Sequence, residues 1–273
     1  MRSISATVKP KAKQMQPPSN IDVFIATDRK SLLPALVLSY SIRRHASLPV
    51  RACPLMASDR LAGSGGEWLD GAAALLFTLA SAKRFRGAAQ LLAANALACA
   101  DIAPLLQVDF GSALLLVPEA TPSDAVLPGA KHGSPTTPIV SVCCEQDAWQ
   151  SRDAAAATNA VPMEWCAHTL PAEWARGDPR DPMAPLVHYA DPLRYPWLSA
   201  EHETGVGWFL ELRLMLDAGA LAWHQLNEEV EAGWLRPSLV NEVRHMPHLN
   251  GFDPALARQY MELDERAGFR KPG

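Results

Sequence analysis

The sequence lacks a long apolar run, a strong excess of charge and any closely spaced pair of metal-binding cysteines. No stretch approaches the roughly 18 consecutive apolar residues that a membrane-spanning helix needs. The formal net charge is only −4 over 273 residues, so the chain has no long-range attraction for nucleic acid or for an anionic membrane. The sequence therefore favours neither a nucleic-acid-binding protein nor a membrane-spanning one.

Cysteine and glycine are present without the spacings that give them a shared role. The cysteines number five and include no C-x-x-C pair, so they predict reduced thiols in a cytoplasmic protein rather than a disulfide framework or a zinc site. The glycine-rich segment "LAGSGGEW" (61–68) lacks the spacing of a dinucleotide-binding motif and indicates a flexible connection. The cysteines are Cys53, Cys99, Cys143, Cys144 and Cys166.

Residues 1–20, "MRSISATVKPKAKQMQPPSN", combine basic side chains with proline but contain no apolar core. We expect a flexible basic tail here, neither a signal peptide nor a membrane anchor.

What is present is an alternation of apolar strands and helices in a chain that is 48% hydrophobic, enough to bury a large core. "IDVFIAT" (21–27) predicts a buried strand, and the helix after it has Ser31 as N-cap, Pro34 in its first turn and basic residues at its end. The pattern predicts an α/β fold with a mostly parallel, Rossmann-like sheet. Further strands are expected at 49–58, 88–94, 111–118 and 138–144, and further helices at 71–85 and from Asp101.

The pattern becomes helical after residue 198. In the segment 201–219, Trp208, Leu212 and Met215 fall on one helix face. We therefore expect an α/β domain over 21–198 and a C-terminal helical region over 199–273 packed on it. Within 120–183, which is dense in proline and alanine, the strand at 138–144 is the only element predicted.

Polar residues follow several of the predicted strands. Parallel sheets bind ligands at the carboxyl ends of their strands. This rule brings together Thr27 and Asp28, the "AAN" at 93–95 and the residues near "LVHYAD" (186–191) around one expected cleft.

Five segments, in this order and with similar separations, resemble bacterial glycosyltransferase family 8. They are "IDVFIATDRKSLLPALVLSYSIRRHASLPV", "DIAPLL", "VPMEW", "VHYADPLRYPWLS" and "EEVEAGWLRPSLVNEV". The resemblance extends from Ile21 to about Arg244 and is weakest across 110–160. It implies a GT-A fold that binds a UDP-sugar, transfers a hexose with retention of configuration, and uses a divalent cation, usually manganese. In the family, a D-x-D pair and a later histidine hold this cation, which neutralises charge on the departing UDP.

The segment "GAAQLLAANALACADI" (87–102) aligns without gaps with the family's D-x-D region. It places Ala93 and Asn95 where the two acids stand. Alanine offers no ligand atom and asparagine only a neutral carbonyl, so the resemblance implies a degenerate metal site and no firm cofactor. The positions that agree with the family pattern are Gly87, Leu92, Ala94, Leu97, Asp101 and Ile102.

Two further positions depart from the family pattern. The same overlay puts Leu76 where the family has an arginine facing the sugar-diphosphate, with Phe77 after it. Arg84-Phe85 is an alternative match, but it requires a deletion inside the helix and we prefer the ungapped alignment. Cys166 takes the asparagine position of the family's "P-F-E-W-N" segment, which also puts the donor-sugar end of the pocket in doubt.

Other family positions are retained. Asp28 matches the acid near the uracil and ribose, and His188 matches the histidine of the metal site. We assign Thr27, Asp28, His188 and Arg194 as nucleotide-binding candidates, and no catalytic residue is assigned. A structural role for His188 and a solvated turn for Asp191 and Arg194 are the competing interpretations.

Several other polar and aromatic groups carry weaker hypotheses. Glycoside hydrolysis would need a pair of carboxylates, and the acidic pairs of this sequence lie in irregular segments. Tryptophans that could stack on sugar rings lie in such segments as well. A metal site at the two histidines of "RHMPHLN" is disfavoured by the proline between them, and the glutamates of "NEEVE" are expected to be solvated. These residues are Glu145, Asp147, Asp178, Asp181, Trp149, Trp165, Trp174, His245, His248, Glu228, Glu229 and Glu231.

Three functions are consistent with these residues. The first is a binding or scaffolding protein in glycan assembly that has lost metal-dependent transfer, with UDP or a UDP-sugar as ligand and a related glycosyltransferase as candidate partner. The second is an active, metal-independent glycosyltransferase in which Arg194 or Arg84 replaces the cation. The third is a structural protein that keeps only the fold.

Overall fold

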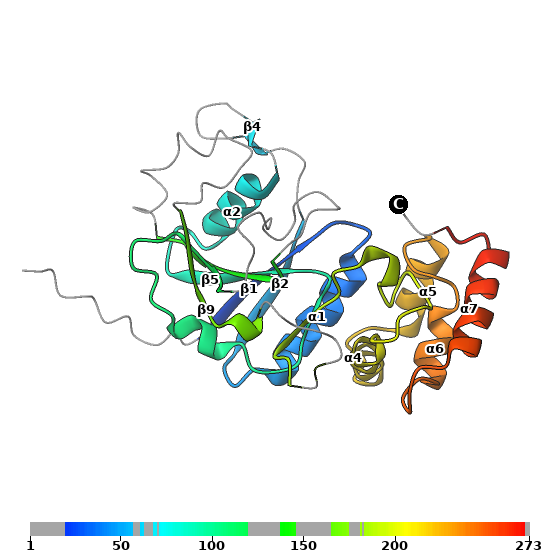
Figure 1. Cartoon of the computed structure of the whole chain (residues 1–273). Helices are drawn as coiled ribbons and strands as arrows, with labels where there is room; N and C mark the ends of the chain where they lie inside the picture. The colour runs from blue at the N-terminus through cyan, green and yellow to red at the C-terminus, as the bar shows by residue number, and fades with distance from the viewer. Residues whose placement is uncertain are drawn as a thin grey trace, which may run out of the picture.

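The computed structural model describes residues 20–56, 61–62, 68–69, 71–119, 137–145, 165–174, 181 and 183–270. Its centre is a six-stranded sheet with the order β2-β1-β5-β8-β7-β9 (Figure 1). Strand β1 is parallel to β2 and β5, β7 is parallel to β9, and β8 is antiparallel to β5 and β7. The predicted α/β class with a mostly parallel sheet is therefore confirmed. The strands are β1 (Ile21–Thr27), β2 (Val50–Met56), β5 (Ala88–Ala93), β7 (Leu115–Pro118), β8 (Ile139–Cys143) and β9 (Cys166–Leu170).

Both faces of this sheet are buried, which explains the near-continuous apolar character of its strands. Because side chains alternate along a strand, Val23 and Ile25 of β1 pack in the cluster that includes α1 (Leu32–His45). Phe24 and Ala26 point the other way, into the cluster that includes α2 (Gly71–Ala82). The two helices thus cover opposite faces of the sheet.

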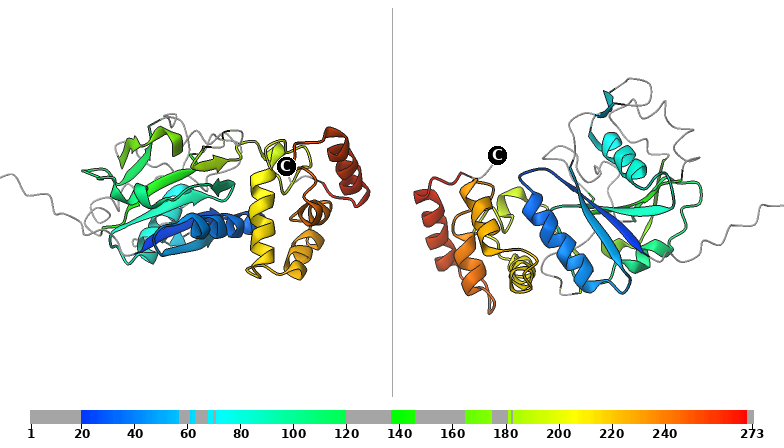
Figure 2. Two further views of the ribbon diagram at one scale, coloured as in Figure 1. Left: turned by 90° about the horizontal axis from the view of Figure 1, so that it is seen from below. Right: turned by 180° about the vertical axis from the view of Figure 1, so that it is seen from behind.

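Helix α1 is buried on two sides. Ala35 and Leu38 contact the sheet cluster, whereas Leu33 and Val37 belong to a third cluster formed with the C-terminal helices. These helices lie beside α1, away from the sheet (Figure 2). They are α4 (Val206–Asp217), α5 (Trp223–Glu231), α6 (Leu239–His245) and α7 (Pro254–Arg266).

The C-terminal part of the chain was expected to be helical, and α4 confirms the predicted apolar face. Trp208, Leu212 and Met215 are all buried in the third cluster. The helix begins at Val206, five residues later than the start of the predicted segment at Glu201.

A two-stranded ribbon outside the main sheet connects β5 to the C-terminal part. Strand β6 (Ala96–Ala98) pairs antiparallel with β10 (Leu186–His188), and His188 lies opposite Ala96. The short helix expected from Asp101 is the 3-10 helix η1 (Ala103–Gln107). The N-cap position is Ile102, and the carboxylate of Asp101, one residue earlier, accepts a hydrogen bond from Ala103 N–H at 2.9 Å.

Two local elements differ in detail from what the sequence predicts. The segment 61–68, expected to be a flexible connection, contains β3 (Leu61–Ala62), which pairs antiparallel with β4 (Trp68–Leu69). The helix expected over 71–85 ends at Ala82, because Arg84 and Phe85 adopt left-handed backbone angles (φ 55° and 53°) that end a helix. The basic tail at 1–19 lies outside the described residues.

Within the described ranges, no helix combines the length and apolar character needed to cross a bilayer.

Candidate functional site

The sheet register brings the candidate residues of two strands to one edge. Strands β1 and β5 are parallel neighbours in which Ala26 lies opposite Ala93. Thr27 and Asp28 therefore leave the sheet beside the turn that carries Asn95. Sequence reasoning placed these groups around one cleft, and the described strands bring their backbones side by side.

His188 is delivered to the same turn by β10. Its backbone lies opposite Ala96, one residue after Asn95, and its Nε2 lies 3.2 Å from Asn95 Nδ2. The overlay on the family pattern had matched these two residues to ligands of one metal ion. They are indeed in contact, although 93 positions separate them in the chain.

The side chain of Asn95 acts as a hydrogen-bond donor. Its Nδ2 donates to the backbone oxygen of Tyr189 at 2.9 Å and to Tyr195 Oη at 3.0 Å. A carbonyl oxygen can only accept, so the amide nitrogen, and not the amide oxygen, faces this group. Tyr189 N–H returns a hydrogen bond to the Asn95 backbone oxygen at 2.9 Å. Two N–H bonds of one amide thus serve three acceptors: Tyr189, Tyr195 and His188.

His188 is largely buried and neutral at neutral pH. Burial lowers the pKa of its imidazole from 6.5 to about 4, because the low-dielectric surroundings disfavour the charged form. With an amide nitrogen opposite Nε2, this atom is the acceptor and the ring proton resides on Nδ1. The lone pair that a metal ligand would use is directed at Asn95.

Ala93, the other degenerate position, is buried at 5% exposure. Its side chain offers no oxygen, and its backbone N–H is used by Pro138 O at 3.0 Å. Among the described residues, the one group of three potential metal-binding side chains lies elsewhere, at His202, Glu242 and His248.

The turn after β1 is organised by its own side chains. Asp28 Oδ1 accepts from Ser31 N–H at 2.8 Å and from Ser31 Oγ at 2.5 Å. Thr27 is 5% exposed, and its hydroxyl donates a hydrogen bond to Asp28 O at 3.1 Å. Ser31 holds the predicted N-cap position of α1, but its side chain makes no capping bond. Asp28, three residues earlier, satisfies the Ser31 N–H instead.

Arg29 joins this turn to the C-terminal helices. Its guanidinium forms a bidentate pair with Glu229 of α5, at 2.6 and 2.8 Å, and lies 5.6 Å from the ring centre of Trp234. Glu229 was expected to be a solvated helix residue, and that expectation was wrong. No local pattern could have found this pair, because 200 positions separate its members.

Arg194 lies at the surface, in the 3-10 helix η4 (Pro192–Arg194). Its Nε is 3.6 Å from the carboxylate of Asp191, and both side chains are more than half exposed. Asp191 also accepts from Leu193 N–H at 2.9 Å. The assignment of Arg194 to a nucleotide remains a prediction.

Leu76, matched to the family's arginine, is fully buried in the cluster beneath α2. A side chain at this position of α2 faces the sheet rather than a ligand at its edge. Arg84, the alternative match, is exposed in the turn after α2. The side chain of Phe77 lies outside the described residues.

The remaining candidates take structural positions where they are described. Trp165 and Trp174 are each 5% exposed and belong to the core. Glu145 accepts from Gly87 N–H at 2.7 Å, and Asp181 accepts from Met183 N–H at 2.9 Å. Cys166 begins β9 and is partly buried. Asp147, Trp149 and Asp178 lie outside the described residues.

A cavity of about 340 Å³ opens elsewhere on the molecule. Its lining is mostly apolar and includes Leu105 of η1, Trp174 and Pro185. None of the candidate nucleotide-binding residues lines it.

Comparison with known proteins gives similarity at the level of structure alone. No protein-family model and no curated protein sequence matches the chain. Among solved structures, the glycosyltransferase GlyE of Streptococcus pneumoniae TIGR4 is 15% identical over 81% of this chain and 66% of its own, with a TM-score of 0.49. The bifunctional glycosyltransferase WbbM is 14% identical over 75% of this chain and 50% of its own, with a TM-score of 0.44.

A third similar structure is the galactosyltransferase LgtC, in complex with donor and acceptor sugar analogues. It is 14% identical over 65% of this chain and 89% of its own, with a TM-score of 0.37. The chain spans less than two thirds of the length of GlyE and half that of WbbM. These are similarities between structures and say nothing by themselves of the activity of this chain.

Proposed function

We propose that this chain is a glycosyltransferase-like protein whose candidate site binds UDP or a UDP-sugar without a divalent cation. In this proposal it serves glycan assembly as a binding or scaffolding partner rather than as a metal-dependent transferase. The observation that supports it most directly is the contact of the Asn95 amide nitrogen with His188 and Tyr189.

The argument rests on what a cation would need at this edge of the sheet. Manganese and magnesium prefer anionic oxygen ligands, but position 93 carries a methyl group and position 95 presents an N–H donor. The imidazole of His188 is turned toward that donor. The two polar groups therefore satisfy one another as donor and acceptor, and a cation entering between them would meet an N–H group.

The features that support nucleotide binding lie on β1 and α1. Asp28 stands at the carboxyl end of a parallel strand, where α/β sheets bind ligands. Helix α1 begins four residues later, at Leu32, with no acidic residue in its first turn. A helix start of this kind favours anionic groups, and here the Asp28 carboxylate already accepts the Ser31 N–H. A carboxylate at position 28 can accept hydrogen bonds from the imide or hydroxyl groups of a nucleoside.

Titration calorimetry with UDP, once with manganese and once with EDTA, tests this function. We expect UDP binding whose affinity differs less than about twofold between the two conditions, and no turnover of UDP-hexoses. UDP affinity at least tenfold tighter with manganese would overturn the proposal that the site binds without a metal. Absence of UDP binding would favour a structural protein that keeps only the fold.

A matched pair of variants locates the binding. Asp28→Asn removes the charge of the candidate carboxylate and is expected to weaken UDP binding. Asp109→Asn is the control, because Asp109 is also a loop aspartate that accepts a backbone N–H, from Gly111 at 3.0 Å, and it is not among the candidate residues. Equal effects of the two substitutions would argue against the assignment of Asp28.

A metal-independent transferase is the second candidate. It is favoured by the exposure of Arg194, whose side chain is 62% exposed and therefore able to reach a ligand. An arginine can hold a diphosphate through two parallel hydrogen bonds. Turnover of a UDP-hexose in EDTA that is lost in Arg194→Ala, but kept in the distant surface variant Arg266→Ala, would establish this alternative.

A further inference from the structure

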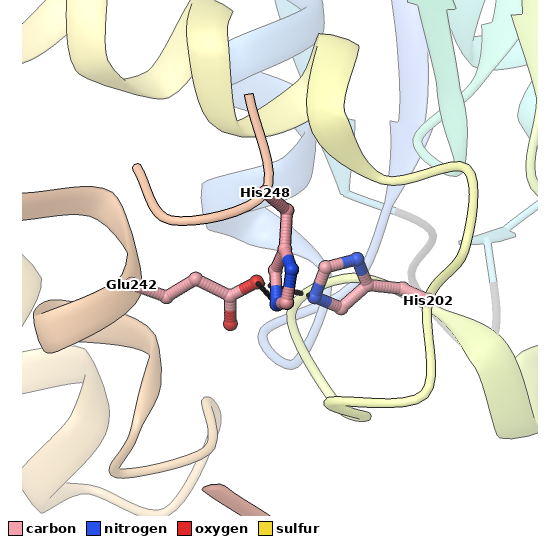
Figure 3. A group of neighbouring side chains, drawn as sticks. All are labelled: His202, Glu242 and His248. Carbon is pink, nitrogen blue, oxygen red and sulfur yellow. Dashed lines mark ion pairs between the residues drawn. The ribbon is translucent and has the colours of Figure 1, made fainter. Parts of the chain in front are cut away.

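The segment before α4 meets α6 and the loop that precedes α7 at a buried cluster of two histidines and a glutamate. His202 lies in the segment before α4, Glu242 on α6, and His248 in the loop between α6 and α7 (Figure 3). Their side chains are only 1%, 2% and 3% exposed. Buried ionisable groups are retained only where partners satisfy them, so the partners of each atom decide what this cluster does.

Glu242 divides its two carboxylate oxygens between different partners. Oε2 is paired with the guanidinium of Arg236, which is itself fully buried. Oε1 lies 2.6 Å from His202 Nε2 and 3.5 Å from His248 Nε2. These contacts lower the pKa of Glu242 despite the opposing effect of burial, so the carboxylate is ionised and serves as the acceptor at the centre of the cluster.

Arg236 and the groups around it supply the rest of the charge. The guanidinium also donates to Pro196 O at 3.0 Å and to Ser238 Oγ, and its Nη2 is 3.3 Å from His202 Nε2. From α7, Asp264 accepts from Ser238 N–H at 2.6 Å. Arg236 is thus paired directly with Glu242 and is connected to Asp264 through the Ser238 hydroxyl.

The hydrogen-bond partner of His248 Nδ1 fixes the tautomer of this ring. Asp253 N–H donates to it at 3.2 Å, and Asp253 is the N-cap of α7. A backbone N–H can only donate, so Nδ1 carries the lone pair and the ring proton is on Nε2, which faces Glu242. The His248 ring therefore lies between Glu242 of α6 and Asp253, the N-cap residue of α7.

A second proton on the His202 ring, at Nδ1, would have no acceptor. This nitrogen is buried without a hydrogen-bond partner among the described residues. The backbone of Gly205 packs against it so closely that a Cβ at that position would lie 2.5 Å from Nδ1. Burial is the main cause that lowers the pKa of His202, with Arg236 and His248 acting in the same direction and Glu242 opposing them.

Two histidines and a glutamate are also the donor set of many zinc sites. Two contacts disfavour a metal here. A metal on His248 Nε2 would require the proton to move to Nδ1, where Asp253 N–H already points. The Arg236 guanidinium, a permanent cation, contacts both Glu242 and His202. The geometry suits protons shared with Glu242 better than a metal ion.

We propose that His202, Glu242 and His248 form an acid-sensitive latch that holds α6 and α7 against α4 and the segment 196–202. In its closed form the Nε2 atoms of both rings lie beside Glu242 Oε1, at 2.6 Å for His202 and 3.5 Å for His248. A proton added to His248 Nδ1 would face Asp253 N–H donor to donor and displace the start of α7. A proton added to His202 Nδ1 would be buried without an acceptor beside Arg236. Acid therefore favours the open latch.

The sign of the pH effect follows from linkage. In the open form His202 is solvated and takes up a proton near the ordinary histidine pKa of about 6.5. In the closed form burial lowers the pKa of His202, so opening is coupled to proton uptake as the pH falls below the ordinary value. Uptake of this proton raises the opening constant up to about tenfold per pH unit.

Hydrogen exchange of the whole chain between pH 7.5 and 5, corrected for intrinsic rates, measures the opening. We expect backbone amides of 239–266 to lose protection by about fivefold on going from pH 6.5 to 5.5, while amides of β1 and β5 keep theirs. Equal protection of α6 and α7 at both pH values would overturn the proposal.

The double variant His202→Gln with His248→Asn tests the mechanism. Glutamine keeps an N–H donor at the position of Nε2 and asparagine keeps an acceptor at the position of Nδ1, but neither titrates. We expect the pH dependence of exchange in 239–266 to disappear, whatever the level of protection at pH 7.5. His245→Asn is the matched control, because His245 is exposed at the end of α6, and it should keep the full pH dependence.

Imidazole resonances of the unsubstituted protein give a second reading if the double variant does not fold. The latch requires the His202 ring to stay neutral until protection of α6 and α7 is lost. A His202 ring that becomes protonated while these helices remain protected would contradict it.

Discussion

The side chain of Asn95 and the backbone of Tyr189 are joined by two reciprocal hydrogen bonds. Asn95 Nδ2 donates to Tyr189 O at 2.9 Å, and Tyr189 N–H donates to Asn95 O at 2.9 Å. The turn between β5 and β6 is thereby tied to the end of β10. Any substitution at position 95 changes a structural contact as well as a candidate ligand site.

Asn95→Asp is expected to destabilise the chain by about 1–3 kcal/mol, because a carboxylate oxygen would replace the donor that satisfies the buried Tyr189 carbonyl. Urea unfolding at pH 7.5 measures the change. Manganese should not restore the loss in this single variant, since Ala93 supplies no second carboxylate. A variant as stable as the parent would show that the amide contact contributes little.

Ala93→Asp combined with Asn95→Asp completes the acid pair of the family pattern. We expect UDP to bind this double variant at least tenfold more tightly with manganese than with EDTA, because His188 stands next to position 95 and can join the two acids. Calorimetry in the two conditions gives the ratio. An unchanged ratio would mean that the departure from the family extends beyond these two positions.

Local sequence pattern was sufficient for α1 and α2, for five of the six strands of the sheet and for the meeting of β1 and β5 at one edge, but it did not predict β9. The alternation along 21–27 and the basic residues at the end of α1 are short-range signals. It was insufficient where partners are distant in the chain. Neither the pairing of Arg29 with Glu229 nor the gathering of His202, Glu242 and His248 follows from any spacing.

The overlay on the family pattern had a different limit. It matched residue types at positions but could not tell which atom each side chain presents. Asn95 was weighed as a carbonyl ligand, whereas its nitrogen faces His188 and Tyr189. Leu76 was weighed as a lost ligand contact, whereas it fills the core beneath α2. Both outcomes depend on tertiary packing.

His188 is expected to make folding stability depend on pH. Its pKa is lowered to about 4 in the folded chain but is about 6.5 when unfolded. The stabilisation is fully present above pH 6.5, declines as the pH falls, and is lost below pH 4, with an upper limit of about 3 kcal/mol. His188→Gln keeps an acceptor for Asn95 and should reduce the slope of unfolding free energy between pH 6 and 4.5. An unchanged slope would place the titration at other groups.

The pair of Arg29 and Glu229 should contribute modestly to stability. Arg29 is 47% exposed, so solvent screens the pair, and a double-mutant cycle with alanine is expected to give a coupling free energy of about 0.5–1 kcal/mol. The pair Arg266 and Glu262, with side chains 80% and 63% exposed, is the control and should give less. Coupling should fall in 1 M salt for both pairs.

Two glycines at the start of α4 should respond to alanine with opposite signs. At Gly205 a Cβ would lie 2.5 Å from His202 Nδ1 and 3.0 Å from Pro196 Cβ, and neither partner can withdraw because both are buried. The backbone at Gly205 (φ −78°) would accept alanine, so the expected loss of about 1–3 kcal/mol comes from overpacking. At Gly207 the nearest side-chain atom, Leu97 Cδ2, would be 3.5 Å away, an ordinary contact. Alanine there should stabilise the helix by up to about 1 kcal/mol. Thermal unfolding of both variants decides the matter, since an equal shift of the two midpoints would show that Gly205 is not packed against His202 as described.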